Sequence, residues 1–178
     1  MTETADLTAL IRTIPDYPRP GIQFRDVSTL LLDGPGFRKT IDRLAAMVDA
    51  DTDLIAGIEA RGFSVAAAIS YVLTKGKVML RKKGKLPGAV VGIDYALEYG
   101  TDRMELHADA VRPGQKIVLI DDLLATGGTA LAGATLLRRQ GAIVEQALFI
   151  VDLPMLGGAK RLIDAGVRPG ALVDFDGD

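Results

Sequence analysis

The chain has 178 residues, 48% hydrophobic and 25% charged, a composition typical of folded globular domains that argues against a disordered or fibrous chain. Its formal net charge of −2 provides no general attraction for nucleic acid or anionic lipid, so any anion site must be built locally. The absence of cysteine excludes a disulfide framework and a thiolate nucleophile, and the single histidine, His107, excludes a zinc site made mainly of histidines.

The first ten residues, MTETADLTAL, lack the basic stretch and the long apolar run of a signal peptide. The longest charge-free stretch, residues 123–137, contains glycines and is shorter than the roughly 18 apolar residues of a membrane helix. We therefore expect a cytoplasmic protein whose partners include neither a membrane nor nucleic acid.

Two helices are expected first along the chain. Residues Glu3 to Ile14 carry apolar positions at helical spacing and are followed by Pro15, and residues Pro35 to Asp49 place apolar side chains on one helical face.

Beyond these helices, short apolar strands alternate with helical patterns. The strands are expected at 54–58, 78–81, 116–120 and 143–151, and the helices at 63–74, 129–140 (with Gly141 as the C-terminal cap) and 158–165. Uninterrupted apolar strands between helices predict an α/β fold, with a central parallel sheet flanked by helices in a single domain spanning 1–178. The sequence after Val167 predicts no element.

The segment from Lys82 to Pro113 interrupts this alternation. It shows little periodicity, and it is far longer than an ordinary connection of roughly 4 to 6 residues. We therefore expect residues 82–112 to form a long flexible loop with a function.

The strongest chemical motif is the run IVLIDDLLATGGT, residues 117–129. An apolar strand delivers Asp121 and Asp122 at its carboxyl end, the edge where open α/β sheets bind ligands. The glycines of the next loop let backbone N–H groups approach a phosphate closely, and the helix N-terminus favours negative charge. A strand, a turn and two solvated aspartates is the alternative, but adjacent carboxylates repel one another unless cations, hydroxyls or water stabilise them.

This run resembles the binding motif for phosphoribosyl pyrophosphate (PRPP) of the type I phosphoribosyltransferases. The resemblance implies that the loop holds the 5′-phosphate and that Asp121 and Asp122 contact the ribose hydroxyls. The loop residues are Ala125, Thr126, Gly127, Gly128 and Thr129.

A second anion site is expected at residues 57–64, GIEARGFS. The glycine spacing is that of a P-loop, but Phe63 stands where the phosphate-binding lysine belongs, which excludes an ATPase. The residues alone leave two readings open, a tight turn with an exposed arginine and a turn whose amides and Arg61 hold a pyrophosphate. The segment resembles the pyrophosphate loop of adenine phosphoribosyltransferases, which implies PRPP contacts from Glu59, Ala60 and Arg61.

The run RKKGKLPG, residues 81–88, places four positive charges within five positions at the start of the long loop. A charge run is usually a solvated face, but here it is placed to neutralise a diphosphate leaving group, with glycine and proline as hinges. Together with LEYGT, residues 97–101, it resembles the flexible catalytic loop of the same family. The resemblance implies PRPP binding by Arg81, Lys82 and Lys85. It also implies catalytic roles for Arg61, Lys85 and Glu98, of which Glu98 interacts with the purine during proton transfer.

The run PGIQFRDV, residues 20–27, would otherwise be interpreted as core. It resembles the hood that covers adenine in that family, which implies a small N-terminal hood within residues 1–34 and adenine contacts from Gln23, Phe24 and Arg25, largely through the backbone. Gln23 stands where an apolar residue is usual. The resemblance continues through residues 151–162, with Asp152 in place of an expected glutamate.

Taken together, the resemblance implies a purine salvage glycosyltransferase that moves the phosphoribosyl group of PRPP to adenine, giving AMP and diphosphate. It further implies a homodimer and Mg²⁺ held mainly by PRPP, with no direct protein ligands. Two alternatives stay open: a hypoxanthine, guanine or xanthine phosphoribosyltransferase, and a non-catalytic PRPP-binding regulator. The hood sequence argues against the first. The short segment before Pro15 and the negative net charge argue against the second.

Overall fold

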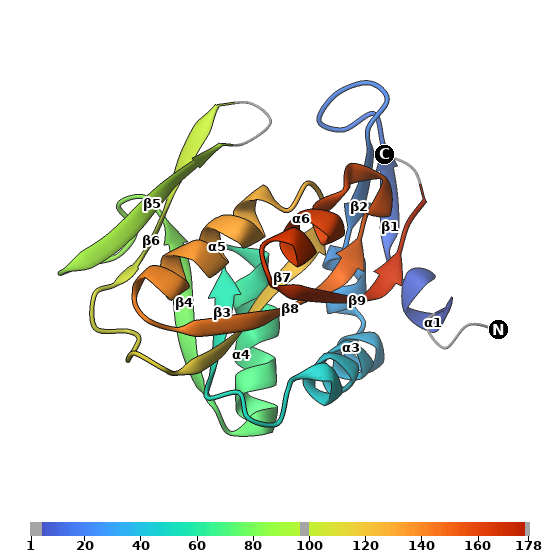
Figure 1. Cartoon of the computed structure of the whole chain (residues 1–178). Coiled ribbons are helices and arrows are strands. Elements are labelled where there is room, and N and C mark those ends of the chain that lie inside the picture. Colours follow the sequence, from blue (N-terminus) through green and yellow to red (C-terminus); the bar gives the residue numbers. More distant parts are fainter. Residues whose placement is uncertain (1–4, 97–99, 177–178) are drawn as a thin grey trace.

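The structure is a computed structural model that describes residues 5–96 and 100–176. At its centre is a seven-stranded sheet with the strand order β5-β6-β4-β3-β7-β8-β9 (Figure 1). Five neighbouring strands are parallel, four of them expected from the sequence and the fifth, β9, not expected, whereas β6 and β5 are antiparallel additions at one edge. The parallel strands are β4 (Gly76–Lys82), β3 (Leu54–Ile58), β7 (Lys116–Leu124), β8 (Ile143–Asp152) and β9 (Arg168–Asp174).

Helices cover both faces of this sheet, because successive residues of its central strands are buried on opposite sides. Ile117 and Leu119 of β7 belong to the cluster under α5 (Gly128–Arg139) and α6 (Gly158–Asp164). Val118 and Ile120 belong to the cluster under α3 (Gly34–Met47) and α4 (Arg61–Leu73). The expected helices and strands from residue 35 to residue 81 and from residue 116 to residue 165 are thereby confirmed to within a few residues at each end.

The expected N-terminal helix is wrong over most of its length. Helix α1 spans only Ala5–Thr8, and Arg12–Pro15 form strand β1, which pairs antiparallel with β2 (Gln23–Asp26). The apolar spacing that suggested a helix arises because Leu7 and Ile11 are buried, whereas Ile14 pairs with Phe24 across the two-stranded sheet. Pairing with a distant strand therefore overrides the local pattern. The β1–β2 pair is the small hood, followed by α2 (Ser28–Leu32).

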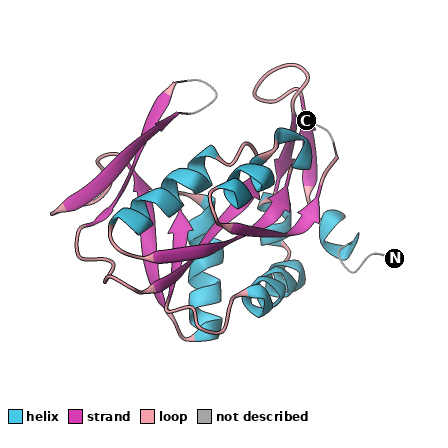
Figure 2. Ribbon diagram, viewed as in Figure 1, coloured by secondary structure: helices cyan, strands magenta, loops and turns pink. Residues whose placement is uncertain are grey.

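The interruption after Lys82 contains a hairpin rather than structureless chain. Strands β5 (Val90–Ala96) and β6 (Thr101–His107) pair along their full length, and β6 joins the sheet through Arg81 and Lys82 of β4. In Figure 2 this hairpin projects at the upper left and the hood at the upper right. The flexibility expected for residues 82–112 stays a prediction.

The C-terminal segment, for which the sequence predicts no element, forms the edge strand β9 beside β8. A short 3-10 turn, Pro154–Leu156, precedes α6. Within the described residues, no helix has the length and apolar character needed to cross a membrane.

Candidate active site

The acidic pair of β7 lies where the sequence places it, at the carboxyl end of the strand. Asp122 is buried, and the backbone N–H of Asp122 donates to Asp121 Oδ1 at 2.9 Å. Burial and the negative charge of Asp122 raise the pKa of Asp121 well above its usual range, and the Arg61 charge opposes this. Arg61 Nε, at the start of α4, lies 2.9 Å from Asp122 Oδ2, so the Arg61 guanidinium offsets the negative charge of the acidic pair.

Two glycines allow α4 to lie close to the sheet, Gly62 beside β7 and Gly57 in β3. A Cβ on Gly62 would lie 2.8 Å from Asp121 Oδ1 and 2.9 Å from the carbonyl oxygen of Ile120. A Cβ on Gly57 would lie 2.7 Å from Cβ of Ala66 in the first turns of α4. The sequence offers one signal for both glycines, their P-loop-like spacing, but this spacing does not predict the close contacts.

The phosphate loop, Ala125 to Thr129, leads into α5 through Gly127, whose φ of 76° suits glycine. The loop lies directly against the start of α6, because a Cβ on Gly158 would lie 2.2 Å from the carbonyl oxygen of Ala125. Nη1 of Arg161, one turn into α6, lies 3.5 Å from the Thr126 carbonyl oxygen. The loop thus packs against the start of α6 and leads into the N-terminus of α5. The backbone N–H groups at the N-terminus of α5 favour an anion.

The pyrophosphate turn, Glu59 to Arg61, is joined to the basic run that follows β4. The Glu59 carboxylate accepts from Nε and Nη2 of Arg81, both at 3.2 Å, and from the Lys82 backbone N–H at 2.8 Å. These bonds, that of Arg81 above all, hold the pKa of Glu59 below its usual range despite the burial that opposes them. The peptide bond between Glu59 and Ala60 is cis. Through its two hydrogen bonds with Arg81, the Glu59 carboxylate holds the Arg81 side chain in place.

The other cations of the basic run point in different directions. The Lys82 ammonium forms an ion pair with Asp102 and donates to the Tyr95 hydroxyl at 2.7 Å, both in the hairpin. Burial lowers the pKa of Lys82, but the bonds to Asp102 and Tyr95 outweigh it, so the pKa is raised. Lys85 is exposed, and its carbonyl oxygen accepts from Arg81 Nη1 at 3.0 Å. The expected catalytic residue Glu98 lies outside the described residues.

The hood brings Phe24 to the same place. The guanidinium carbon of Arg61 lies 5.7 Å from the centroid of the Phe24 ring, and Tyr17 packs edge-on against that ring at 5.2 Å. The Arg25 guanidinium carbon instead lies 4.4 Å from the centroid of the Phe175 ring, and Arg25 Nη1 donates to Thr13 Oγ1 at 2.7 Å. Gln23 pairs with Pro15 at the end of the hood. Arg61 therefore contacts both Phe24 and Asp122, so residues of three separate motifs lie next to one another.

An ion pair that the sequence analysis missed anchors the hood. Arg12 of β1 bonds the buried Asp26 of β2, and the Ser28 backbone N–H donates to Asp26 Oδ1 at 2.9 Å. These bonds, led by that of Arg12, lower the pKa of Asp26 to about 2. Asp26 therefore fixes both the pairing of the hood strands and the turn into α2.

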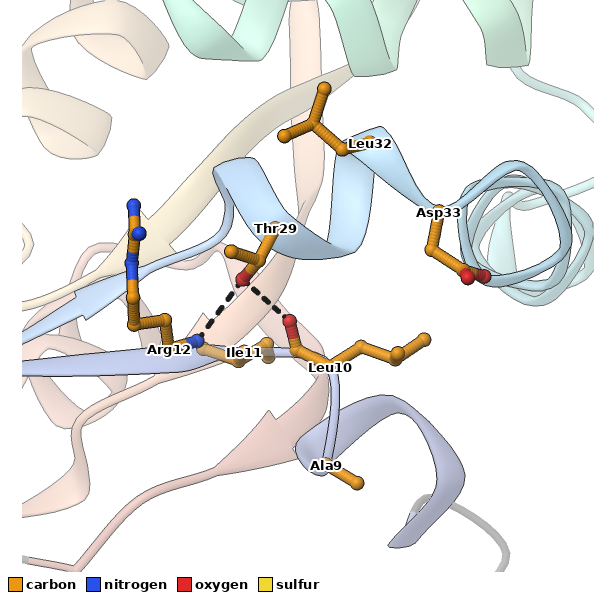
Figure 3. A pocket seen from close by; sticks show the side chains of 7 residues that line it. All are labelled: Ala9, Leu10, Ile11, Arg12, Thr29, Leu32 and Asp33. Carbon is orange, nitrogen blue, oxygen red and sulfur yellow. Dashed lines mark hydrogen bonds between the residues drawn. The ribbon is translucent and has the colours of Figure 1, made fainter.

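An open hollow of about 500 Å³ lies at the base of the hood and is unrelated to these motifs (Figure 3). Its lining runs from Ala9 to Arg12 and includes Thr29, Leu32 and Asp33. In Figure 3 the Thr29 hydroxyl bridges the Arg12 backbone N–H and the Leu10 carbonyl, which closes the base of the hood. None of the expected substrate-binding residues lines this hollow.

Known proteins resemble the chain over nearly its whole length. Residues 28–161 match the phosphoribosyl transferase domain family. A curated adenine phosphoribosyltransferase from Sphingopyxis alaskensis is 57% identical, with 97% of this chain and 95% of that protein covered.

Two solved structures of adenine phosphoribosyltransferases share the fold. The enzyme from Thermoanaerobacter pseudethanolicus superposes with a TM-score of 0.90 at 44% identity, over 96% of this chain and 98% of that one. The enzyme from Saccharomyces cerevisiae, solved in complex with an imino-altritol bisphosphate and adenine, superposes with a TM-score of 0.86 at 30% identity, over 96% and 98% of the two chains. The chain therefore belongs to the phosphoribosyltransferase family and, within it, to the adenine phosphoribosyltransferases.

Proposed function

We propose that the protein transfers the phosphoribosyl group of PRPP to adenine, giving AMP and diphosphate, and so serves purine salvage. The observation that carries this proposal is the meeting of Phe24, Arg61 and Asp122. It joins the hood, the pyrophosphate turn and the acidic pair, three motifs that the family resemblance assigns separately to base, diphosphate and ribose. The yeast relative was crystallised with adenine, which agrees with adenine as the acceptor.

The acidic pair and the phosphate loop hold the ribose 5-phosphate part of PRPP. The loop from Ala125 to Thr129 offers backbone N–H groups and hydroxyls at the N-terminus of α5, a favourable place for the 5′-phosphate. Asp121 and Asp122 accept from the ribose hydroxyls. The Oδ2 atom of Asp122 is buried and, apart from its ion pair with Arg61, has no hydrogen-bond partner among the described residues, so a ribose hydroxyl would satisfy it.

The pyrophosphate turn and the basic run take the leaving group. Arg61 pairs with Asp122 of the acidic pair, and positive charge comes from Arg81 and Lys82 at the end of β4 and from Lys85 in the turn after it. Glu59 acts on the diphosphate indirectly, through Arg81. Stabilising the charge that develops as the bond at the anomeric carbon breaks is the main catalytic task, because an oxocarbenium-like transition state needs no covalent nucleophile.

Mg²⁺ is proposed as the cofactor, held mainly by the oxygens of PRPP. Mg²⁺ keeps several waters and binds substrate phosphates readily, so PRPP would hold it without a direct protein ligand, near the acidic pair of β7. No cluster of three His, Cys, Asp or Glu side chains that could hold a metal occurs in the described part of the chain. When bound, the cation neutralises charge on the diphosphate as it departs.

Adenine is proposed to lie under the hood, recognised by backbone groups of residues 22–25 and covered by Phe24. The Arg61 guanidinium carbon lies 5.7 Å from the Phe24 ring centroid, so the pyrophosphate turn adjoins the hood at this point. Glu98 is proposed to assist proton transfer at the purine, with Arg61 and Lys85 acting on the diphosphate side.

A homodimer and a cytoplasmic location complete the proposal and are supported by the resemblance of the motifs. Sedimentation equilibrium across a tenfold range of protein concentration distinguishes a dimer from a monomer. A mass equal to that of one chain throughout would contradict the dimer.

The activity is tested by PRPP-dependent formation of AMP from adenine, followed by chromatography, with a panel of other bases in parallel. The double substitution Asp121→Asn and Asp122→Asn is expected to abolish transfer while the thermal transition persists, since one positioned group is usually worth about 10² or more in rate. Activity within about tenfold of the parent at saturating PRPP would refute the role given to the acidic pair.

A further inference from the structure

Lys82 is bonded on two sides in this structure. Its backbone N–H donates to Glu59 of the pyrophosphate turn at 2.8 Å, but its ammonium is held by the hairpin, in an ion pair with Asp102 and a 2.7 Å bond to the Tyr95 hydroxyl. Tyr95 and Asp102 face each other across β5 and β6, and their side chains also bond at 3.3 Å. The Lys82 ammonium, which is expected to bind the diphosphate, is therefore already bonded to two side chains of the protein.

The two partners differ in how firmly they are fixed. Asp102 Oδ1 accepts from the Arg103 backbone N–H at 2.7 Å, and Tyr95 is buried in the core cluster under α5. Lys82 carries its charge on a flexible four-carbon stem. Lys82 is therefore the member of the trio that moves when its ammonium changes partner.

The ion pair is also open to competition. The side chains of Lys82 and Asp102 are 36% and 27% exposed, so the ammonium is within reach of a dissolved anion. Partly exposed ion pairs are weak, whereas a diphosphate offers several charged oxygens to the same ammonium. One ammonium bound to Asp102 is not available to a ligand elsewhere, so the two anions compete.

We propose that Asp102 and Tyr95 form a rest position for Lys82, from which its ammonium is transferred to the diphosphate group of PRPP. Asp102 is then a positioning residue that lowers the affinity for PRPP, because part of the binding free energy is used to break its ion pair. Transfer of Lys82 also removes one side-chain contact between β4 and the hairpin, which stays joined to β4 through the backbone pairing of β6 with Arg81 and Lys82. The inference rests on the diphosphate role proposed for Lys82.

The test compares Asp102→Asn with Asp94→Asn by titration calorimetry, with PRPP in the presence of Mg²⁺. Asp94 is a matched control because it lies in the same hairpin and pairs with Arg103, at 3.2 Å, instead of Lys82. Asp102→Asn is expected to lower the Kd for PRPP by about threefold to fivefold, the range that a partly exposed ion pair provides. Asp94→Asn is expected to change the Kd by less than about 1.5-fold, which measures the general effect of removing one negative charge.

Steady-state kinetics separate the rest position from a merely structural role. If Asp102 holds Lys82 back, Asp102→Asn lowers the KM for PRPP without changing kcat, since the loss of an ion pair of the free enzyme favours the substrate complex and the transition state equally. A structural role predicts the opposite, a raised KM together with a lower thermal midpoint. A raised KM or a weaker Kd would therefore overturn the inference.

Lys82→Ala, alone and combined with Asp102→Asn, completes a double-mutant cycle. We expect Lys82→Ala to weaken PRPP binding and Asp102→Asn to have no further effect in its background. If Lys82→Ala leaves the Kd unchanged, the diphosphate role of Lys82 is wrong, and the inference fails with it. If Lys82→Ala weakens binding but Asp102→Asn does not tighten it, or tightens it equally without Lys82, only the rest position is refuted.

Discussion

The substitution Gly62→Ala should separate the geometry of the site from the stability of the fold. The added Cβ would lie 2.8 Å from Asp121 Oδ1 and 2.9 Å from the Ile120 carbonyl oxygen, whereas ordinary contacts begin near 3.4 Å. Strand β7 is a central strand with helices on both faces, so it cannot yield. The start of α4 must therefore move outward by about half an ångström, and Arg61, the preceding residue, moves with it.

The expected cost is larger in rate than in stability. Because a misplacement of about 1 Å costs roughly 10²-fold, half that shift predicts a loss of at least about tenfold in kcat/KM for PRPP. Overpacking costs about 1–3 kcal/mol, but alanine in place of glycine in a helix recovers about 1 kcal/mol, which leaves a net cost of at most about 2 kcal/mol. At about 2–4 °C per kcal/mol for a chain of this size, the thermal midpoint should fall by less than about 8 °C.

Gly34→Ala is the matched control, because a Cβ at the start of α3 meets no atom within 4 Å. It should leave kcat/KM unchanged and not lower the thermal midpoint. Both variants are measured by initial rates of AMP formation over a range of PRPP concentrations and by thermal unfolding. A kcat/KM for Gly62→Ala within about threefold of the parent would mean that the close approach of α4 to β7 does not position Arg61 for the reaction.

Three further predictions concern the loop, the base and the hood. Limited proteolysis between Lys82 and Glu105 should slow when PRPP and Mg²⁺ are present, and equal cleavage rates would refute closure of this segment. Adenine should be preferred over hypoxanthine by about 10⁴ in kcat/KM, because a backbone donor and acceptor near Gln23 would each face a like group on hypoxanthine; a ratio below about ten would favour recognition through the adaptable Gln23 amide. Asp26, whose pKa falls from 3.8 unfolded to about 2 folded, stabilises the hood above pH 4, and this contribution should be lost as the pH falls through 2. Acid unfolding of Asp26→Asn, compared with that of the parent, measures it, and identical pH dependence of the two would contradict the role of this ion pair.

Four of the five parallel strands were predictable, because the apolar runs of β3, β7 and β8 are buried on both faces and β4 follows in the same alternation of strands and helices. Runs such as Ile117 to Ile120 are apolar without interruption, and that pattern between helices has few other interpretations. The acidic pair and the phosphate loop were predictable for the same reason, because they directly follow such a strand.

The hairpin, the hood strand and β9 were not predictable, because their residues depend on distant partners. Strand β5 includes Gly92, where a Cβ would lie 2.8 Å from Arg103 Nη2. Gly92 and Asp94 interrupt the pattern of apolar and polar residues by which a strand is predicted. The ion pair of Arg12 with Asp26 and that of Lys82 with Asp102 likewise join residues far apart in the chain. No local pattern reveals such a pairing.

The three ion pairs of the site suggest why its cations are stable without substrate. Arg61 pairs with Asp122, Arg81 with Glu59, and Lys82 with Asp102, so three of the four cations proposed to act on PRPP have a carboxylate partner from another segment. Without these partners, the positive charges of Arg61, Arg81 and Lys82 would repel one another. The chain has 23 acidic and 21 basic residues, so carboxylates are available to pair with them. An incoming diphosphate must then replace carboxylates rather than water. The affinity for PRPP would therefore depend on the difference between phosphate and carboxylate as partners, which makes each carboxylate, and not only each cation, a determinant of substrate binding.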